Sequence, residues 1–325
     1  MNNLTVSPSP HVKGSMSTQR IMLCVIVSLL PAVIASCIIF GLRALLLILL
    51  CVAASACFEG VTRIIMKREQ TITDLSAAVT GLLLALNLPV TIPFWQAIIG
   101  CFIAIVVVKQ LFGGLGQNFA NPAIVGRIVL MLSFTTNMTT WAIPFNWNVN
   151  EAMPAGATGS IEIAGNTVFT GPTPLITETA SYKDLFLGNV GGCIGETCAL
   201  ALLIGGIYLI IRGIISPVTP VAFIGTIALL NLIAGNDVLY QLLSGGLILG
   251  AFFMATDYVT TPVTSLGKLI FGIGCGVITF LIRQFGSYPE GVSFSILLMN
   301  IVTPYIDTFT MTKPLGAKKL KKEAE

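Results

Sequence analysis

The stretch Ile21–Phe40, IMLCVIVSLLPAVIASCIIF, contains 20 residues and no charged side chain. A helix that crosses a lipid bilayer needs about 20 predominantly apolar residues, so this stretch predicts a membrane-spanning helix. The whole chain shares this character: 55% of its 325 residues are hydrophobic, 10% are charged, and the mean hydropathy is +0.91. A soluble domain carries about 25% charged residues. We therefore expect an all-α polytopic membrane protein and no nucleic-acid partner.

Apolar runs recur along the chain and predict about ten transmembrane helices. The runs are Ile21–Phe40, Gly41–Phe58, Leu75–Leu88, Trp95–Leu111, Ala123–Phe134, Gly192–Ile211, Val218–Ala234, Leu239–Ala255, Leu266–Ile282 and Val292–Ile306. The third and fifth runs are short, and each follows a stretch that carries Gly or Asp, which indicates broken or half-buried helices. Irregular backbone at membrane depth is tolerated only where protein covers it or where it lines a cavity.

The basic residues indicate the orientation. With the N-terminus inside, thirteen of the 17 Lys and Arg residues fall in cytoplasmic segments, and five of these thirteen lie in the tail. Cytoplasmic loops of membrane proteins are enriched in Lys and Arg, so both termini are expected to be cytoplasmic. The expected parts are a cytoplasmic arm (1–20), a first five-helix repeat (21–134), an extracytoplasmic loop (135–191), a second five-helix repeat (192–306) and a basic cytoplasmic tail (307–325).

Sequence echoes between the two halves suggest a 5+5 inverted repeat. Thr73-Asp74 opens the third run and Thr256-Asp257 follows the eighth, while Phe112-Gly113 recurs as Phe285-Gly286. Because five is odd, the two halves would cross the membrane in opposite orientations. Inverted repeats of this kind place sites near the midplane, at the interface between the repeats.

The longest polar gap contains the hexapeptide Thr170–Leu175, TGPTPL. Its hydroxyl groups are flanked by Gly and Pro and lie outside the lipid, where a modifying enzyme is expected to reach them. An ordinary turn is the alternative interpretation of such a Thr-Pro segment.

Four ionisable residues at or inside the predicted spans are candidates for function, because such groups are costly in a membrane. They are Asp74, Arg127, Glu196 and Asp257. The matched contexts of Asp74 and Asp257 favour an ion path or a cofactor contact, although helix capping or a hydrated interface also accounts for each. Glu196 lies in a glycine-rich segment that lets backbone N–H groups approach a phosphate or a flavin, or lets helices pack closely.

The segment Gly113–Pro122 carries two further candidates. Asn118 and Asn121 have the side chains to hydrogen-bond the edge of a heterocycle, and Asn121 also has the position of a helix cap. Arg127 is expected either to reach the membrane interface or to pair with a phosphate. The eight cysteines lack Cys-x-x-Cys spacing and there is a single His, so no metal site is expected.

Several segments, in the same order along nearly the whole chain, match a known protein family. They are Ser9–Val12, Arg20–Met22, Phe112–Arg127, Gly191–Thr197, Phe253–Asp257, Gly267-Lys268 and Tyr288–Gly291. The chain resembles the RnfD subunit of the Rnf ferredoxin:NAD⁺ oxidoreductase, a family related to the NqrB subunit of the Na⁺-pumping NADH:quinone reductase.

The resemblance implies a covalent flavin. In this family a flavin transferase attaches FMN through its phosphate to a Thr in a motif like Ser/Thr-Gly-Ala-Thr. The match here is Thr170-Gly171-Pro172-Thr173, with Thr173 as the acceptor and Pro172 in place of the usual alanine. Thr158, in Gly156-Ala157-Thr158, is the second choice because it lacks the leading hydroxyl residue.

The resemblance also implies an ion-translocating enzyme component in the bacterial cytoplasmic membrane, inactive alone, with the A, B, C, E and G subunits of the Rnf complex as partners. Electron transfer through the flavins would drive Na⁺ or H⁺ outward. A noncovalent riboflavin or second flavin would lie along Phe112–Arg127. The implied cofactor-binding residues are Thr173, Thr170, Gly171, Asn118, Asn121, Arg127 and Glu196. An NqrB-like component of the quinone reductase and a urea-channel-like transporter without redox activity are the alternatives.

Overall fold

The computed structural model describes residues 17–145, 159–163, 166–177, 180–286 and 290–311. Most of the N-terminal arm, residues 312–325 of the basic tail, Thr158 and the Tyr288-Pro289 pair lie outside the described residues. The described chain is mostly helical, as expected of a polytopic membrane protein.

The first half of the chain forms a layer of helices. Its elements are α1 (Thr18–Phe40), α2 (Leu42–Ile65), the 3₁₀ turn η1 (Ile72–Asp74), α3 (Ser76–Leu86), α4 (Phe94–Phe102), the π-helical segment η2 (Ile103–Gln110), α5 (Pro122–Ser133) and α6 (Thr135–Met138). Asn121 begins α5 as its cap, because its Oδ1 accepts a hydrogen bond from the Ala123 amide at 3.1 Å. The capping role that the sequence suggested for Asn121 is therefore confirmed.

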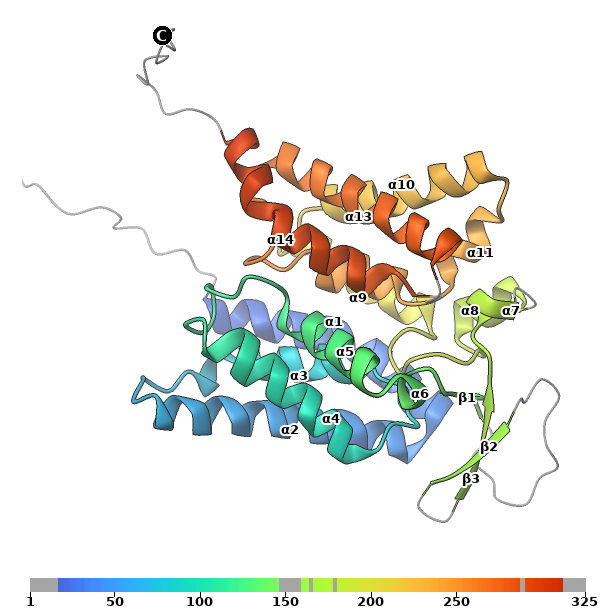
Figure 1. The fold of residues 1–325 in the computed structure, drawn as a ribbon, viewed down its shortest axis with the longest axis horizontal. Coiled ribbons are helices and arrows are strands. Elements are labelled where there is room, and N and C mark those ends of the chain that lie inside the picture. Colours follow the sequence, from blue (N-terminus) through green and yellow to red (C-terminus); the bar gives the residue numbers. More distant parts are fainter. Residues whose placement is uncertain (1–16, 146–158, 164–165, 178–179, 287–289, 312–325) are drawn as a thin grey trace, which may run out of the picture.

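The second half forms the other layer (Figure 1). Its elements are α9 (Ala199–Ile211), α10 (Val218–Ala234), α11 (Val238–Leu243), α12 (Leu247–Leu249), the π-helical segment η3 (Gly250–Met254), α13 (Ser265–Phe285) and α14 (Val292–Thr310). The helix in the run Gly192–Ile211 begins only at Ala199, since the glycine-rich start of that run is irregular. The run Leu239–Ala255 is interrupted between α11 and α12, where Gly245 has a φ of 66°.

A small antiparallel sheet and two short helices lie between the two halves in sequence. The strands are β1 (Trp141–Ala142), β2 (Gly159–Ile163) and β3 (Asn166–Gly171), ordered β1-β3-β2, and the helices are α7 (Pro174–Thr177) and α8 (Tyr182–Leu187). Figure 1 shows them at one end of the helical body, whereas the first turn of α1 and the last turn of α14 lie at the opposite end.

Every apolar run of the sequence contains helical structure, although the runs Gly192–Ile211 and Leu239–Ala255 are helical only in part. Within the described residues, α1, α2, α13 and α14 are long and apolar enough to cross a membrane. The count of ten crossings and the inverted repeat stay predictions. The short helix α3 is enclosed by protein, with all but one of its residues buried, as a half-length helix at membrane depth requires.

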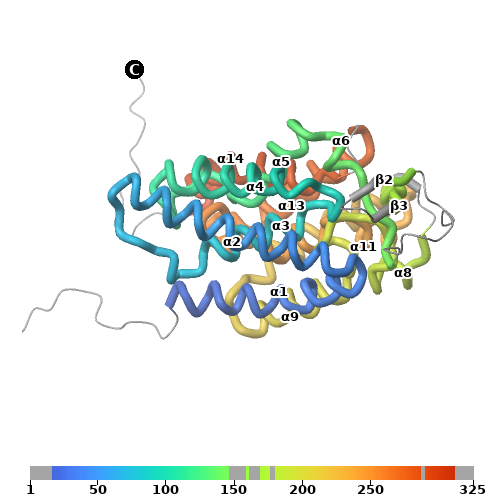
Figure 2. The backbone as a smooth tube through the Cα atoms, turned by 90° about the horizontal axis from the view of Figure 1, so that it is seen from below, coloured from blue at the N-terminus to red at the C-terminus, as the bar shows by residue number. Residues whose placement is uncertain are grey.

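Glycines bring the backbones of neighbouring helices together. Gly205 of α9 faces α1 so closely that a Cβ there would lie 2.0 Å from the carbonyl oxygen of Ser28. Figure 2 shows α1 and α9 side by side. Close approach through small residues is how helices pack where lipid removes the hydrophobic drive for association. The contact ties the first half to the second.

Candidate functional site

The hexapeptide is docked on the helical body instead of projecting from it. Thr170 and Gly171 end β3, where they pair with Ala142 and Trp141 of β1. Thr173 follows directly, and its side chain is 3% exposed. We expected a modifying enzyme to reach this hydroxyl directly, whereas in the structure Thr173 is buried.

The docking follows from a hydrogen-bonded anchor on α11. The hydroxyl of Tyr240 donates to the carbonyl of Pro174 at 3.0 Å, and the amide of Ala180 donates to the same hydroxyl at 3.4 Å. The side chain of Leu175 packs against Gly245, where a Cβ would lie 2.8 Å from Leu175 Cδ1. The hexapeptide is thus held against the second half of the chain.

Thr173 borders a small cavity of about 290 Å³, open solvent included, that reaches a buried charge cluster. Glu196 and Glu290 line the same cavity, and their side chains are 2% and 8% exposed. The structure therefore brings the predicted residues Thr173 and Glu196 together. Glu290 has no role in the sequence-based site, although it is an acidic residue between the apolar runs Leu266–Ile282 and Val292–Ile306.

Arg127 of α5 lies between the two carboxylates. Its Nη1 is 2.7 Å from Glu196 Oε1, and its Nη2 pairs with Glu290 Oε2. Nη1 also donates to Asn87 Oδ1 at 2.7 Å and to Ser293 Oγ at 3.2 Å. The side chain of Arg127 is 4% exposed and pairs with two buried carboxylates, so the expectation that it reaches the membrane interface is wrong.

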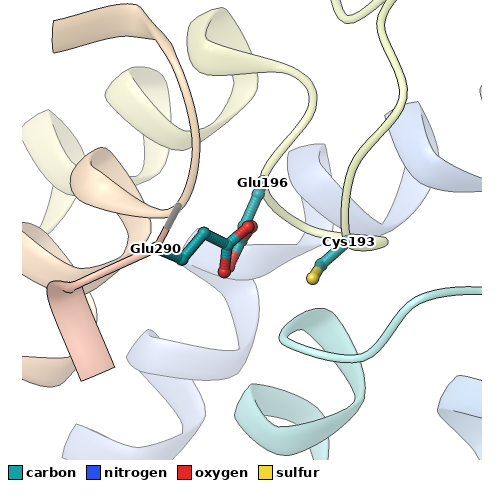
Figure 3. A group of neighbouring side chains, drawn as sticks. All are labelled: Cys193, Glu196 and Glu290. Atoms are coloured by element: carbon teal, nitrogen blue, oxygen red, sulfur yellow. The ribbon is translucent and has the colours of Figure 1, made fainter. Parts of the chain in front are cut away.

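Cys193 completes the cluster, with its Sγ 3.5 Å from Arg127 Nη2. Figure 3 shows the carboxyl groups of Glu196 and Glu290 together, with the sulfur of Cys193 beside them. The ligand-type atoms of these three residues lie within 4.8 Å of one another. Because Arg127 already contacts both carboxylates, we interpret the group as a buried ion-pair cluster that joins the two halves.

A second site is a cavity of about 780 Å³, open solvent included, toward the other end of the helices. The predicted residues Asn118, Asn121 and Asp257 line it together with Ser76 and Lys109. Both π-helical segments contribute to its wall, η2 through Lys109 and η3 through Phe252 and Phe253. Such segments often occur at functional sites.

Lys109 contributes a buried ammonium group to the wall of this cavity. Its Nζ lies 3.1 Å from Glu59 Oε1 and 2.6 Å from Ser76 Oγ, and its side chain is 2% exposed. Asp74 accepts hydrogen bonds from the amide of Ser76 at 2.8 Å and from its hydroxyl at 2.5 Å, which form an Asx turn directly before α3. Asp74 is thus connected through Ser76 and Lys109 to the cavity that Asp257 lines.

The pair Glu59–Lys109 was not predicted from the sequence, which assigned Lys109 to a cytoplasmic segment. The signal was present, since Lys109 lies inside the apolar run Trp95–Leu111. An ionisable residue inside such a run indicates a buried partner. Glu59, at the end of the run Gly41–Phe58, supplies it.

These observations define the class: a multi-pass helical membrane protein with buried charges between its halves and a docked Thr-Pro loop at one end. The chain belongs to the NQR2, RnfD, RnfE family, whose family model matches residues 5–316. The resemblance found in the sequence is thereby confirmed.

Curated relatives match over almost the full length. The chain is 49% identical to the D subunit of a Na⁺-translocating ferredoxin:NAD⁺ oxidoreductase complex of Acetobacterium woodii, over 99% of this chain and 98% of the relative. It is 42% identical to the D subunit of a proton-translocating ferredoxin:NAD⁺ oxidoreductase complex of Clostridium ljungdahlii, over 98% of both chains. It is 36% identical to the D subunit of an ion-translocating oxidoreductase complex of Escherichia coli, over 97% of this chain and 99% of the relative.

Proposed function

We propose that this chain is the membrane subunit of a ferredoxin:NAD⁺ oxidoreductase that couples electron transfer through flavin to Na⁺ or H⁺ translocation. The observation that carries the proposal is the near-complete coverage of relatives that bear this name, at 49% and 42% identity. The chain acts with the A, B, C, E and G subunits of the Rnf complex and has no activity alone.

The proposed topology has ten crossings in a 5+5 inverted arrangement, with both termini in the cytoplasm and the loop outside. The position of the sheet, α7 and α8 at the end opposite to the first turn of α1 and the last turn of α14 supports it (Figure 1). The asymmetry of the basic residues supports the same orientation. The membrane is the bacterial cytoplasmic membrane.

Thr173 carries FMN in a phosphoester made by a flavin transferase. The surroundings fit a tether at this position, because the residues on its C-terminal side are anchored through Pro174 to Tyr240. With its side chain 3% exposed, Thr173 must leave its pocket before a transferase reaches its hydroxyl. Bound flavin supplies one- and two-electron transfer, and the residues of the chain hold and orient it.

The larger cavity is the proposed site of a noncovalent flavin. Asn118 and Asn121 offer amide donors at one side, Phe252 and Phe253 offer apolar surface, and the cavity has about 780 Å³ of space. Asp257 and Asp74 lie at or next to this cavity and are the proposed ion-path carboxylates. Placing flavin and ion path at one cavity gives electron transfer a direct electrostatic effect on the ion.

The proposal is tested in membranes of a strain that lacks the chain and of the same strain complemented with it. We expect reduction of NAD⁺ by reduced ferredoxin, and the accompanying ion uptake into inverted vesicles, only in the complemented membranes. Quinone reduction by NADH in place of this activity would favour the quinone-reductase alternative. Solute flux without any flavin-dependent activity would favour the channel alternative.

A further inference from the structure

We propose that a second pocket beside the docked loop receives the isoalloxazine ring of the flavin carried by Thr173. The pocket has about 650 Å³ of space, open solvent included, and is lined by Leu175, Asn231, Asn236, Gln241, Phe280, Arg283 and Gln284. The inference rests on the proposed attachment of FMN to Thr173 and assigns the residues that hold its ring.

The pocket lies within reach of the tether. Leu175 lines it and stands two residues after Thr173, and two residues of chain span at most about 7 Å. Gln241 follows Tyr240, whose hydroxyl anchors Pro174. Figure 1 shows α7 and α8 beside α11, next to the ends of α10 and α13 that supply the other pocket residues. A ribityl phosphate arm on Thr173 is therefore long enough to bring the ring to this pocket.

The lining matches the polar edge of a flavin. Four carboxamides, those of Asn231, Asn236, Gln241 and Gln284, surround the pocket. A carboxamide offers both donors and an acceptor. The pyrimidine edge of isoalloxazine presents two carbonyl oxygens with an N–H between them, which is the complementary pattern. Asn236 Nδ2 now bonds Asn231 Oδ1 at 3.1 Å and Gln284 Oε1 at 3.0 Å, a network that can exchange partners with the ring.

Arg283 adds a fixed positive charge. Its Nη1 donates to the carbonyl of Gln241 at 2.7 Å and its Nη2 to the carbonyl of Ser244 at 3.0 Å. The Nε–H is buried and has no acceptor within the part of the chain that the structure describes. A buried donor without an acceptor is costly, and a carbonyl or ring nitrogen of flavin would satisfy it. A cation there also stabilises the negative charge that a flavin gains on reduction.

The cavity that touches Thr173 directly is a poorer place for the ring. It has about 290 Å³ of space and is lined by the carboxyl groups of Glu196 and Glu290, which repel an anionic flavin. Gly245 divides it from the amide-lined pocket: a Cβ at Gly245 would lie 2.8 Å from Leu175 Cδ1 and 3.3 Å from Arg283 Nη2. Charge and size therefore both favour the pocket on the Arg283 side.

Quenching of flavin fluorescence by iodide tests the inference. The protein is co-expressed with a flavin transferase and purified, and the signal of Thr173→Val protein is subtracted to remove noncovalent flavin. In-gel fluorescence of the denatured chain reports attachment, and the iodide quenching constant of the native protein reports docking. The variants are Gln284→Met and Arg283→Met, with Gln19→Met, exposed in the first turn of α1, as the matched control.

We expect a native quenching constant several-fold below that of the denatured chain. Gln284→Met and Arg283→Met should raise it severalfold while in-gel fluorescence stays at the wild-type level, and Gln19→Met should change neither. Arg283→Met should also lower the flavin midpoint potential. A wild-type constant equal to that of the denatured chain, or pocket variants that quench like wild type, would overturn the inference while leaving the attachment intact. A denatured band without flavin on Thr173 would refute the attachment and the inference together.

Discussion

Arg127 and Glu196, which come from opposite halves of the chain, meet in its interior with Nη1 of the arginine 2.7 Å from Oε1 of the glutamate. Glu290, at the start of α14, contacts the same guanidinium. All three residues are buried. A buried cluster of this kind adds little net stability, because the cost of desolvation offsets the attraction between its charges. Removal of one partner is nevertheless costly, because the other charges then remain buried without compensation.

Replacement of Arg127 by Met should therefore be strongly destabilising. Two carboxylates then remain buried without their counter-charge, and we expect a loss of about 3–5 kcal/mol in the free energy of unfolding. Denaturant unfolding of the purified protein in detergent measures it. Arg212→Met, at the exposed end of α9, is the control and should stay within about 0.5 kcal/mol of wild type. An Arg127→Met protein as stable as this control would refute the structural role of the cluster.

Lys109 and Glu59 should behave as one unit. Lys109→Met leaves a buried carboxylate and Glu59→Gln leaves a buried ammonium, so each single change should cost about 3–5 kcal/mol. The double variant should be more stable than the sum of the two losses implies, because neither charge is then stranded. A thermal-unfolding double-mutant cycle measures the coupling, with exposed Lys183→Met as the control. Strictly additive losses would show that the pair does not interact.

Gly205 should tolerate no side chain at the contact between α1 and α9. A Cβ would lie 2.0 Å from the carbonyl oxygen of Ser28, so Gly205→Ala must push the two helices apart and should cost about 1–3 kcal/mol. Gly225 of α10 is the matched control, because a Cβ there meets nothing within 4 Å. Gly225→Ala should be neutral or stabilising by about 0.4–1 kcal/mol. Equal melting temperatures of the two variants would contradict the close packing of α1 on α9.

Asn118→Leu should release the noncovalent flavin. The change removes a buried amide from the wall of the larger cavity while keeping the branching and the number of heavy atoms of the side chain. Acid precipitation separates flavin that is free in the supernatant from flavin that stays with the pellet. We expect the supernatant flavin to fall severalfold and the pellet flavin to remain. Asn189→Leu, exposed near the end of α8, should leave both fractions unchanged. Undiminished supernatant flavin in Asn118→Leu would exclude this cavity as its site.

Local features of the fold were predictable because their causes are local. Apolar runs predict where the helices lie, and Asn121 followed by Pro122 predicts the start of α5. The burial of Thr173 was not predictable from the hexapeptide itself. It depends on Tyr240 and Gly245, which lie more than sixty residues further along the chain.

The buried ion pairs were likewise predictable only in part. Arg127 and Glu196 stand out singly as ionisable residues near apolar segments, yet which carboxylate meets which cation is decided by the packing of the two halves. The burial of Lys109 was missed because counts of basic residues treat each one as a surface charge. A lysine inside the run Trp95–Leu111 needed a buried partner, and Glu59 lies 50 residues before it in the chain.

The most direct test of the proposed function is in-gel flavin fluorescence, with intact mass, of the denatured chain co-expressed with a flavin transferase. Wild type is compared with Thr173→Val and Thr158→Val, which remove a hydroxyl at similar volume. We predict a fluorescent wild-type band with the added mass of FMN less one water, lost in Thr173→Val and retained in Thr158→Val. Loss only in Thr158→Val would move the site. A wild-type chain without covalent flavin, alongside a partner subunit that the same transferase has modified, would contradict the proposal.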